Sequence, residues 1–134
     1  MTMRFGLASS CTVCDTQSVP DEPKRLPAAF FRSLRGAEPV RDWLKGLSDA
    51  DRRILGYDIG MVEFGWPVGM PLCRSLGDGL WEVRSNLSGN RIARTMFCVA
   101  DFRMVLLHGF VKKTQKTPKQ DLDLARTRQK ELQS

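Results

Sequence analysis

Three consecutive strand-like segments in the second half of the chain restrict the fold more than any other feature of the sequence. Each is rich in β-branched and aromatic residues, and each is joined to the next by only a few residues. Joints this short connect neighbouring antiparallel strands. The sequence therefore predicts an antiparallel meander built from residues 80–87, 92–100 and 104–111.

Apolar residues recur at helical spacing on both sides of this meander. Pro39 suits the first turn of a helix, and the apolar residues that follow it at helical spacing are Val40, Trp43, Leu44 and Leu47. Ser48 begins a capping-box sequence, which predicts a second helix running to Gly65. A last helix is expected to start near Thr117. Because residues 104–107 are all apolar, we expect that strand to lie centrally, with helices over both faces.

The remaining segments complete an α+β pattern. Residues 28–34 form a short aromatic segment closed by Gly36, which predicts a first strand. Residues 66–79 are rich in proline and glycine, so we expect a loop there with one short strand at 72–76. The predicted fold is a helical hairpin and a C-terminal helix packed on an antiparallel sheet of about four or five strands.

The first 25 residues differ from the rest of the chain. They are rich in Ser, Thr, Pro and charge and lack apolar periodicity, so we expect a flexible extension over 1–25 and one domain over 26–134. Cys11 and Cys14 form a CxxC, but a zinc site needs a second such pair or nearby histidines, and His108 is the only histidine. No apolar run is long enough for a bilayer or an export signal. We therefore expect a cytoplasmic protein without a metal or other cofactor.

Positive charge is concentrated in one part of the sequence. The chain holds 21 Lys and Arg against 15 Asp and Glu. Between Arg84 and Lys119, eight basic residues accompany a single acidic residue, Asp101. A solvated surface normally mixes charges of both signs. This segregation favours a surface that faces phosphate groups.

Alternation along the strands predicts where the basic side chains point. On the first strand of the meander, Glu82 and Arg84 share one face and Trp81 takes the other. On the next strand, Arg94 falls on a largely apolar side, whereas Arg91 lies at the mouth of the hairpin. Arg91 is therefore expected to be the freer of the two to meet a ligand. A simpler interpretation is that Arg84 forms a salt bridge with Glu82.

The stretch that follows the meander brings together groups that bind anions. It leads into a helix N-terminus, whose free N–H groups and dipole favour an anion. The ammonium and hydroxyl groups in it belong to Lys112, Lys113, Lys116, Thr114 and Thr117. Phe110 is suited to stacking on a base, although packing in the core is the commoner fate of such a residue. His108 is more simply explained as a strand residue hydrogen-bonded to a neighbour than as a catalyst.

Four segments of the sequence carry a combined pattern: GLWEVR at 79–84, Arg91 and Arg94 on the next strand, LLHGFVKKTQKTP at 106–118, and Ala-Arg-Thr-Arg at 125–128. Together they resemble the HigB-like, phage-associated toxins of the RelE superfamily. Order and spacing match over about 26–132, which is far more specific than one motif. The resemblance implies a RelE-like fold, cleavage of messenger RNA on the ribosome, and silencing by a helix-turn-helix antitoxin in a hetero-oligomer.

The resemblance also implies a chemistry and a set of residues. A ribose 2′-hydroxyl would attack its own 3′-phosphate, which needs a base, positive charge for the phosphorane and an acid, but no metal. His108 and Glu82 are the candidates for the base, and the sequence does not choose between them. The implied catalytic residues are Arg84, Arg91, Lys112 and Lys113, and the implied RNA-binding residues are Arg94, His108, Phe110, Lys116 and Thr117.

Two other functions agree with part of the sequence. A non-catalytic module that binds RNA or the ribosome explains the basic segment equally well, and the shortage of general bases slightly favours it. A phage structural or assembly protein has no natural use for clustered Arg84, Arg91, Lys112 and Lys113. The toxin interpretation implies two partners, the antitoxin and messenger RNA on the ribosome, and no membrane.

Overall fold

The computed structural model describes residues 24–112 and 117–133. The elements there form an α+β arrangement, as the sequence predicted. In chain order the elements are β2 (Ala28–Phe30), α2 (Pro39–Lys45), α3 (Asp49–Gly65), β3 (Cys73–Gly77), β4 (Leu80–Leu87), the 3-10 turn η1 (Ser88–Asn90), β5 (Arg91–Ala100), β6 (Arg103–Lys112) and α4 (Lys119–Gln133).

The sheet has five strands in the order β2-β6-β5-β4-β3. The predicted meander is present, because β3, β4, β5 and β6 pair in antiparallel fashion. The sheet is nevertheless mixed, since β2 pairs with β6 in parallel, with Ala28 beside Met104 and Phe30 beside Leu106. A short turn forces two strands to run antiparallel, whereas β2 and β6 are separated by most of the chain, so no turn sets their direction.

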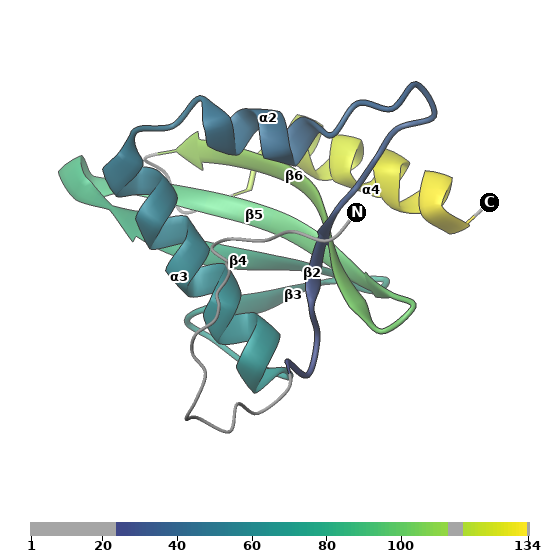
Figure 1. Cartoon of the computed structure of the whole chain (residues 1–134), viewed down its shortest axis with the longest axis horizontal. Helices are drawn as coiled ribbons and strands as arrows, with labels where there is room; N and C mark the ends of the chain where they lie inside the picture. Colours follow the sequence, from purple (N-terminus) through teal and green to yellow (C-terminus); the bar gives the residue numbers. More distant parts are fainter. Residues whose placement is uncertain (1–23, 113–116, 134) are drawn as a thin grey trace, which may run out of the picture.

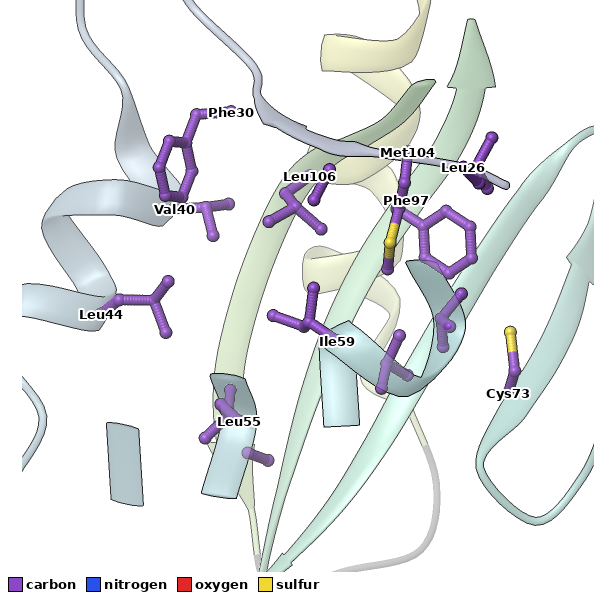
Figure 2. Packing of buried hydrophobic residues seen from close by; sticks show 14 of the residues in the cluster. Leu26, Phe30, Val40, Leu44, Leu55, Ile59, Cys73, Phe97, Met104 and Leu106 are labelled. Carbon is purple, nitrogen blue, oxygen red and sulfur yellow. The ribbon is translucent and has the colours of Figure 1, made fainter. Parts of the chain in front are cut away.

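Helices cover both faces of the sheet (Figure 1). On one face, α2 and α3 bury Leu44, Leu55 and Ile59 against Phe97 of β5 and Leu106 of β6 (Figure 2). On the other face, α4 buries Ala125 in a second apolar cluster, whose strand members include Leu80, Met96 and Leu107. We call these surfaces the α3 face and the α4 face. Burial on both sides explains the apolar character of β6.

The strand predicted to be central lies one place from the centre. Met104, Val105, Leu106 and Leu107 are all buried, which agrees with coverage on both faces. The middle position in the strand order nevertheless belongs to β5, with β6 between it and β2. Any interior strand of a covered sheet shows the same apolar pattern, so the pattern indicates burial without giving the exact place.

The start of α3 follows the predicted cap only in part. The Ser48 hydroxyl accepts a hydrogen bond from the backbone N–H of Asp51 at 3.1 Å, so Ser48 is the N-cap. In a capping box the acidic residue three positions after the cap, here Asp51, accepts from a local backbone N–H. The Asp51 carboxylate instead binds Arg91. A charged partner on a neighbouring strand makes a stronger hydrogen bond than a local amide.

The described part of the chain begins at Lys24, beside the end of α3. The Lys24 ammonium lies 3.2 Å from the Glu63 carboxylate, and the Leu26 N–H donates to the Glu63 carbonyl at 2.9 Å. Most of the predicted extension, with Cys11 and Cys14, lies outside the described residues. Across the described ranges, none of the helices has the length and apolar character that crossing a membrane requires.

Candidate functional site

Two arginines face each other across neighbouring strands near the start of α4. Arg84 of β4 is the register partner of Arg94 of β5, and Arg94 is in turn the partner of Phe110 of β6. Arg84 is partly exposed, while Arg94 is completely buried. Like charges placed directly opposite each other across a sheet are unfavourable unless an anion lies nearby. This pair therefore marks the α4 face as a place for negative charge.

One negative group of the protein already occupies part of this site. Glu82, two residues before Arg84, is completely buried and accepts a hydrogen bond from Arg94 Nη1 at 2.7 Å. The Thr117 hydroxyl donates to the other Glu82 oxygen at 3.1 Å and accepts from Arg94 at 3.3 Å. Thr117, which is predicted to bind RNA, ties the chain just before α4 to the sheet.

Burial changes the role expected for two predicted RNA contacts. Arg94 has no exposed surface, so it supports the site from inside the protein. Phe110 is 8% exposed and belongs to the apolar cluster under α4, which leaves little of its ring for a base. Its ring instead stacks on that of His108, with centroids 5.7 Å apart.

His108 is hydrogen-bonded through both ring nitrogens. Its Nε2 lies 2.7 Å from a carboxylate oxygen of Asp121 in α4. Its Nδ1 lies 3.5 Å from Arg128 Nη1, which also donates to the Leu107 carbonyl at 2.8 Å. The prediction of a strand histidine held by its neighbours is confirmed. Burial lowers the pKa of Arg128, the group that faces Nδ1.

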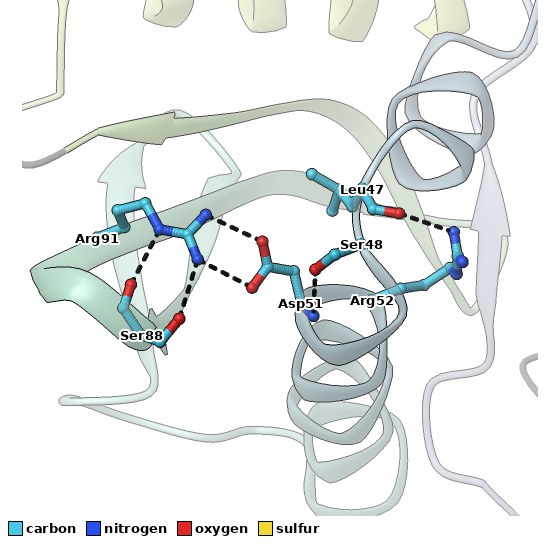
Figure 3. A network of polar contacts seen from close by, with 6 residues as sticks. All are labelled: Leu47, Ser48, Asp51, Arg52, Ser88 and Arg91. Carbon is cyan, nitrogen blue, oxygen red and sulfur yellow. Dashed lines mark hydrogen bonds and ion pairs between the residues drawn. The ribbon is translucent and has the colours of Figure 1, made fainter.

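Arg91 lies on the α3 face, where it meets Asp51 of α3 (Figure 3). Alternation along β5 places Arg94 on the opposite face of the sheet. The Arg91 side chain is 32% exposed, so it is the more open of the two arginines on β5, as predicted. Its guanidinium is nevertheless occupied, because it donates to the two Asp51 oxygens at 2.9 and 3.1 Å and to Ser88. The hydrogen bonds from Arg91 hold the pKa of Asp51 below its usual value. Arg91 thus fastens the β4–β5 hairpin to α3.

The structure describes only one of the three predicted lysines. Lys112 is the last residue of β6, is exposed and pairs in register with Ile92, which pairs with Asn86 of β4. Lys112 therefore lies two residues beyond Phe110, on the edge of the same site. Lys113 and Lys116 lie outside the described residues.

Two polar groups near Arg84 were not singled out in the sequence. Arg74 of the edge strand β3 is the register partner of Glu82, and its Nη1 lies 3.9 Å from the Glu82 carboxylate. Asp58 of α3 lines a pocket of about 350 Å³ together with Arg84. The other lining residues are Ile54, Pro71, Leu72 and Asn86. Burial raises the pKa of Asp58. The concentration of basic residues in 84–119 did not point to Arg74 or Asp58, because both lie outside that segment.

The buried cysteines belong to the core. Cys73 and Cys98 are both buried and unpaired. Burial, together with the nearby Glu82 charge, raises the pKa of Cys73 to about 12, and burial raises that of Cys98 to about 11. Over the residues that can be described, no group of His, Cys, Asp and Glu is arranged to hold a metal ion.

A separate apolar hollow lies on the outer side of α3. It has a volume of about 470 Å³ and is lined by Gly56, Tyr57, Gly60, Met61, Phe64 and Gly65. Tyr57 is 68% exposed, and Met61 and Phe64 are each 48% exposed. The hollow lies away from the sheet, so it is distinct from the arginine site on the α4 face.

Comparison with known proteins places most of the chain in one family. Residues 42–130 match the family model described as Phage derived protein Gp49-like (DUF891). No curated protein matches the sequence. The matched region extends from α2 to α4 and includes Arg74, Glu82, Arg84 and Arg94. Because the match covers well over half of the residues, the chain belongs to the Gp49-like family of phage-derived proteins.

Proposed function

We propose that this protein is the toxin of a type II toxin–antitoxin pair and cleaves messenger RNA on the ribosome. The observation that carries the proposal is the facing pair Arg84 and Arg94, supported from inside by Glu82. Membership of the Gp49-like family and the resemblance to HigB-like toxins agree with it. The partners are a helix-turn-helix antitoxin and ribosome-bound RNA, and the place of action is the cytoplasm.

The proposed reaction is a transfer of phosphate within the RNA. The 2′-oxygen of one ribose attacks the adjacent phosphorus, the bond to the 5′-oxygen of the next nucleotide breaks, and a 2′,3′-cyclic phosphate and a 5′-hydroxyl form. One proton leaves the 2′-hydroxyl and another reaches the departing oxygen. Arg84 stabilises the negative charge of the phosphorane. Arg94 neutralises the buried Glu82 carboxylate, so that this charge does not oppose the phosphate. Lys112, Lys113 and Lys116 contact the RNA backbone.

Glu82 is unsuited to the role of general base. Its two oxygens are engaged by Arg94 and Thr117, and it has no surface that an RNA hydroxyl can reach. His108 is the better candidate, because Asp121 orients its ring and its side chain retains 15% exposure. An imidazole oriented by a carboxylate is a common arrangement for a base. His108 acts in this way only when the hydrogen bond from Arg128 to Nδ1 opens.

Expression in cells tests the proposal. Induction without an antitoxin should arrest growth and cut translated transcripts inside their coding regions, as mapping of 5′ ends would show. Arg84→Ala should reduce cleavage about a hundredfold, since that is the usual effect of removing a preorganised cation. Lys119→Ala is the matched control, because that side chain is 88% exposed on α4 and contacts only Asp123 among the described residues.

The outcomes separate this function from its alternative. A non-catalytic module that binds RNA or the ribosome is favoured by the hydrogen bonds that occupy both nitrogens of His108. Such a module would arrest growth while leaving every transcript intact. Equal cutting of translated and untranslated copies of one transcript would remove the dependence on the ribosome. Full cleavage by Arg84→Ala would show that the active site lies elsewhere.

A further inference from the structure

We propose that Arg74 forms a second phosphate-binding subsite, at the β3 edge of the sheet, for an RNA phosphate next to the one held at Arg84. This inference rests on the proposed function, because it assumes that RNA lies on the α4 face. Nothing in the basic segment of the sequence pointed to Arg74. The family match includes it without giving it a role.

The position of Arg74 relative to Arg84 suits two successive phosphates. Among the strands of residues 24–112, β3 pairs with β4 alone, at the end of the strand order. Arg74 lies directly opposite Glu82, and Arg84 follows Glu82 by two residues on the same strand. Such diagonal neighbours in an antiparallel pair have Cα atoms about 7–8 Å apart. One phosphate at each arginine is therefore compatible with an extended single strand.

The contacts of Arg74 leave it available to a ligand. Its contact with Glu82 is long, at 3.9 Å, whereas Arg94 occupies the same oxygen at 2.7 Å. The Arg74 side chain is 44% exposed, while Glu82 and Arg94 are completely buried. At this length the contact is not a hydrogen bond, and water screens the charge at its half-exposed Arg74 end. Arg74 thus has both the charge and the access that a phosphate contact needs.

The subsite also sets a direction for the RNA. Lys112 lies on β6, three strands away from Arg74 and four residues further along the strand direction. With strands about 4.8 Å apart and a rise of about 3.3 Å per residue, the two positions are separated by roughly 20 Å. At the spacing of about 7–8 Å per phosphate that an extended strand has between Arg74 and Arg84, this span takes about three nucleotides. The RNA then crosses the sheet diagonally, with Arg84 between its ends.

Binding of an RNA that cannot be cleaved tests the subsite separately from catalysis. The probe is a fluorescent 2′-O-methyl octanucleotide, and its dissociation constant is measured by anisotropy between 50 and 200 mM KCl. Arg74→Ala should weaken binding about tenfold and reduce the slope of log K against log salt by about 0.7, the value for one contact to a single strand. Arg74→Lys should restore most of the slope, because it keeps the charge.

Controls exclude a general effect of charge or folding. Arg53→Ala removes one exposed arginine from α3, on the opposite side of the sheet, and should leave the affinity close to that of the wild type. The thermal midpoint of Arg74→Ala should lie within about 2 °C of the wild type, since the residue is at an exposed edge. A 2′-O-methyl dinucleotide is too short to reach both arginines, so on that probe Arg74→Ala should have little effect.

Failure of the subsite differs from failure of the proposed function. If the wild type binds the octanucleotide and Arg74→Ala binds it with the same affinity and salt slope, the subsite is wrong and the function stands. If the wild type does not bind the octanucleotide at any salt concentration, the subsite is overturned, and the function is judged by the cleavage of translated transcripts alone. If Arg74→Ala and Arg53→Ala weaken binding equally, the effect is one of net charge, and the assignment of a subsite is overturned.

Discussion

The carboxylate of Glu82 has no exposed surface, and polar groups from three parts of the chain lie against it. Arg94 comes from β5, Arg74 from β3 and Thr117 from the chain just before α4. A buried charge is tolerated when it is paired and hydrogen-bonded, and becomes costly when one partner is removed. The cluster therefore joins the sheet to the last helix, and its buried members Glu82 and Arg94 support the site from inside.

Replacing Arg94 by Met should destabilise the protein strongly. The change leaves the Glu82 charge uncompensated in the interior, which typically costs about 3–5 kcal/mol. Equilibrium unfolding in urea, followed by circular dichroism, measures the loss. The double variant Arg94→Met with Glu82→Leu removes both charges and should recover most of it. A small effect of Arg94→Met alone would mean that water or another cation compensates the Glu82 charge.

At the scale of the elements, α2 can pack directly on β6 because Gly109 has no side chain. A Cβ atom at Gly109 would lie 2.2 Å from the Trp43 ring, far closer than any real contact. Gly109 is therefore required because an aromatic ring of α2 rests directly on the strand. The sequence showed Trp43 as an apolar helix residue, and Gly109 as one residue of a strand. Their contact was not visible in either pattern.

Gly109→Ala should consequently loosen α2 from the sheet. The added methyl group must displace the Trp43 ring, and overpacking of this kind costs about 1–3 kcal/mol. Urea unfolding measures the change in the free energy of unfolding. In a Trp43→Leu background the smaller side chain leaves room, so Gly109→Ala should cost much less there. Equal costs in both backgrounds would contradict the contact.

Across the whole molecule, the two buried cysteines report on global unfolding. Cys73 lies in the core under α2 and α3, and Cys98 lies in the core under α4. The attacking species is the thiolate, and their pKa values of about 12 and about 11 keep both cysteines as thiols in the folded protein at pH 8. Each core must open before its thiol can react.

The variant carrying both Cys11→Ser and Cys14→Ser should therefore react with a disulfide-based thiol reagent only on unfolding. In native buffer at pH 8 the reaction should be slow, and in urea two equivalents should react at once. The free thiols of the unfolded chain ionise from about pH 9, below the folded pKa values, so stability should decline as the pH rises above that point. Rapid reaction of one thiol in native buffer would show that its core opens locally.

Local patterns in the sequence determined most of the secondary structure of this protein. The strand at Leu80–Leu87 was predicted with its observed bounds, and the N-cap at Ser48 was predicted correctly. Alternation placed Glu82 and Trp81 on opposite faces, as observed. These features depend on neighbouring residues and on short turns, which a single segment of sequence contains. The basic residues of the site were visible for the same reason.

Only the tertiary structure decided which distant groups meet. It paired Arg91 with Asp51, brought Arg74 and Arg94 to Glu82, placed Trp43 on Gly109 and set β2 parallel to β6. Asp51 and Arg91 are 40 residues apart, and the local sequence around one residue does not predict a contact with the other. Such pairs form because the burial of two apolar clusters brings whole surfaces together, and polar groups at those surfaces then take the nearest opposite charge.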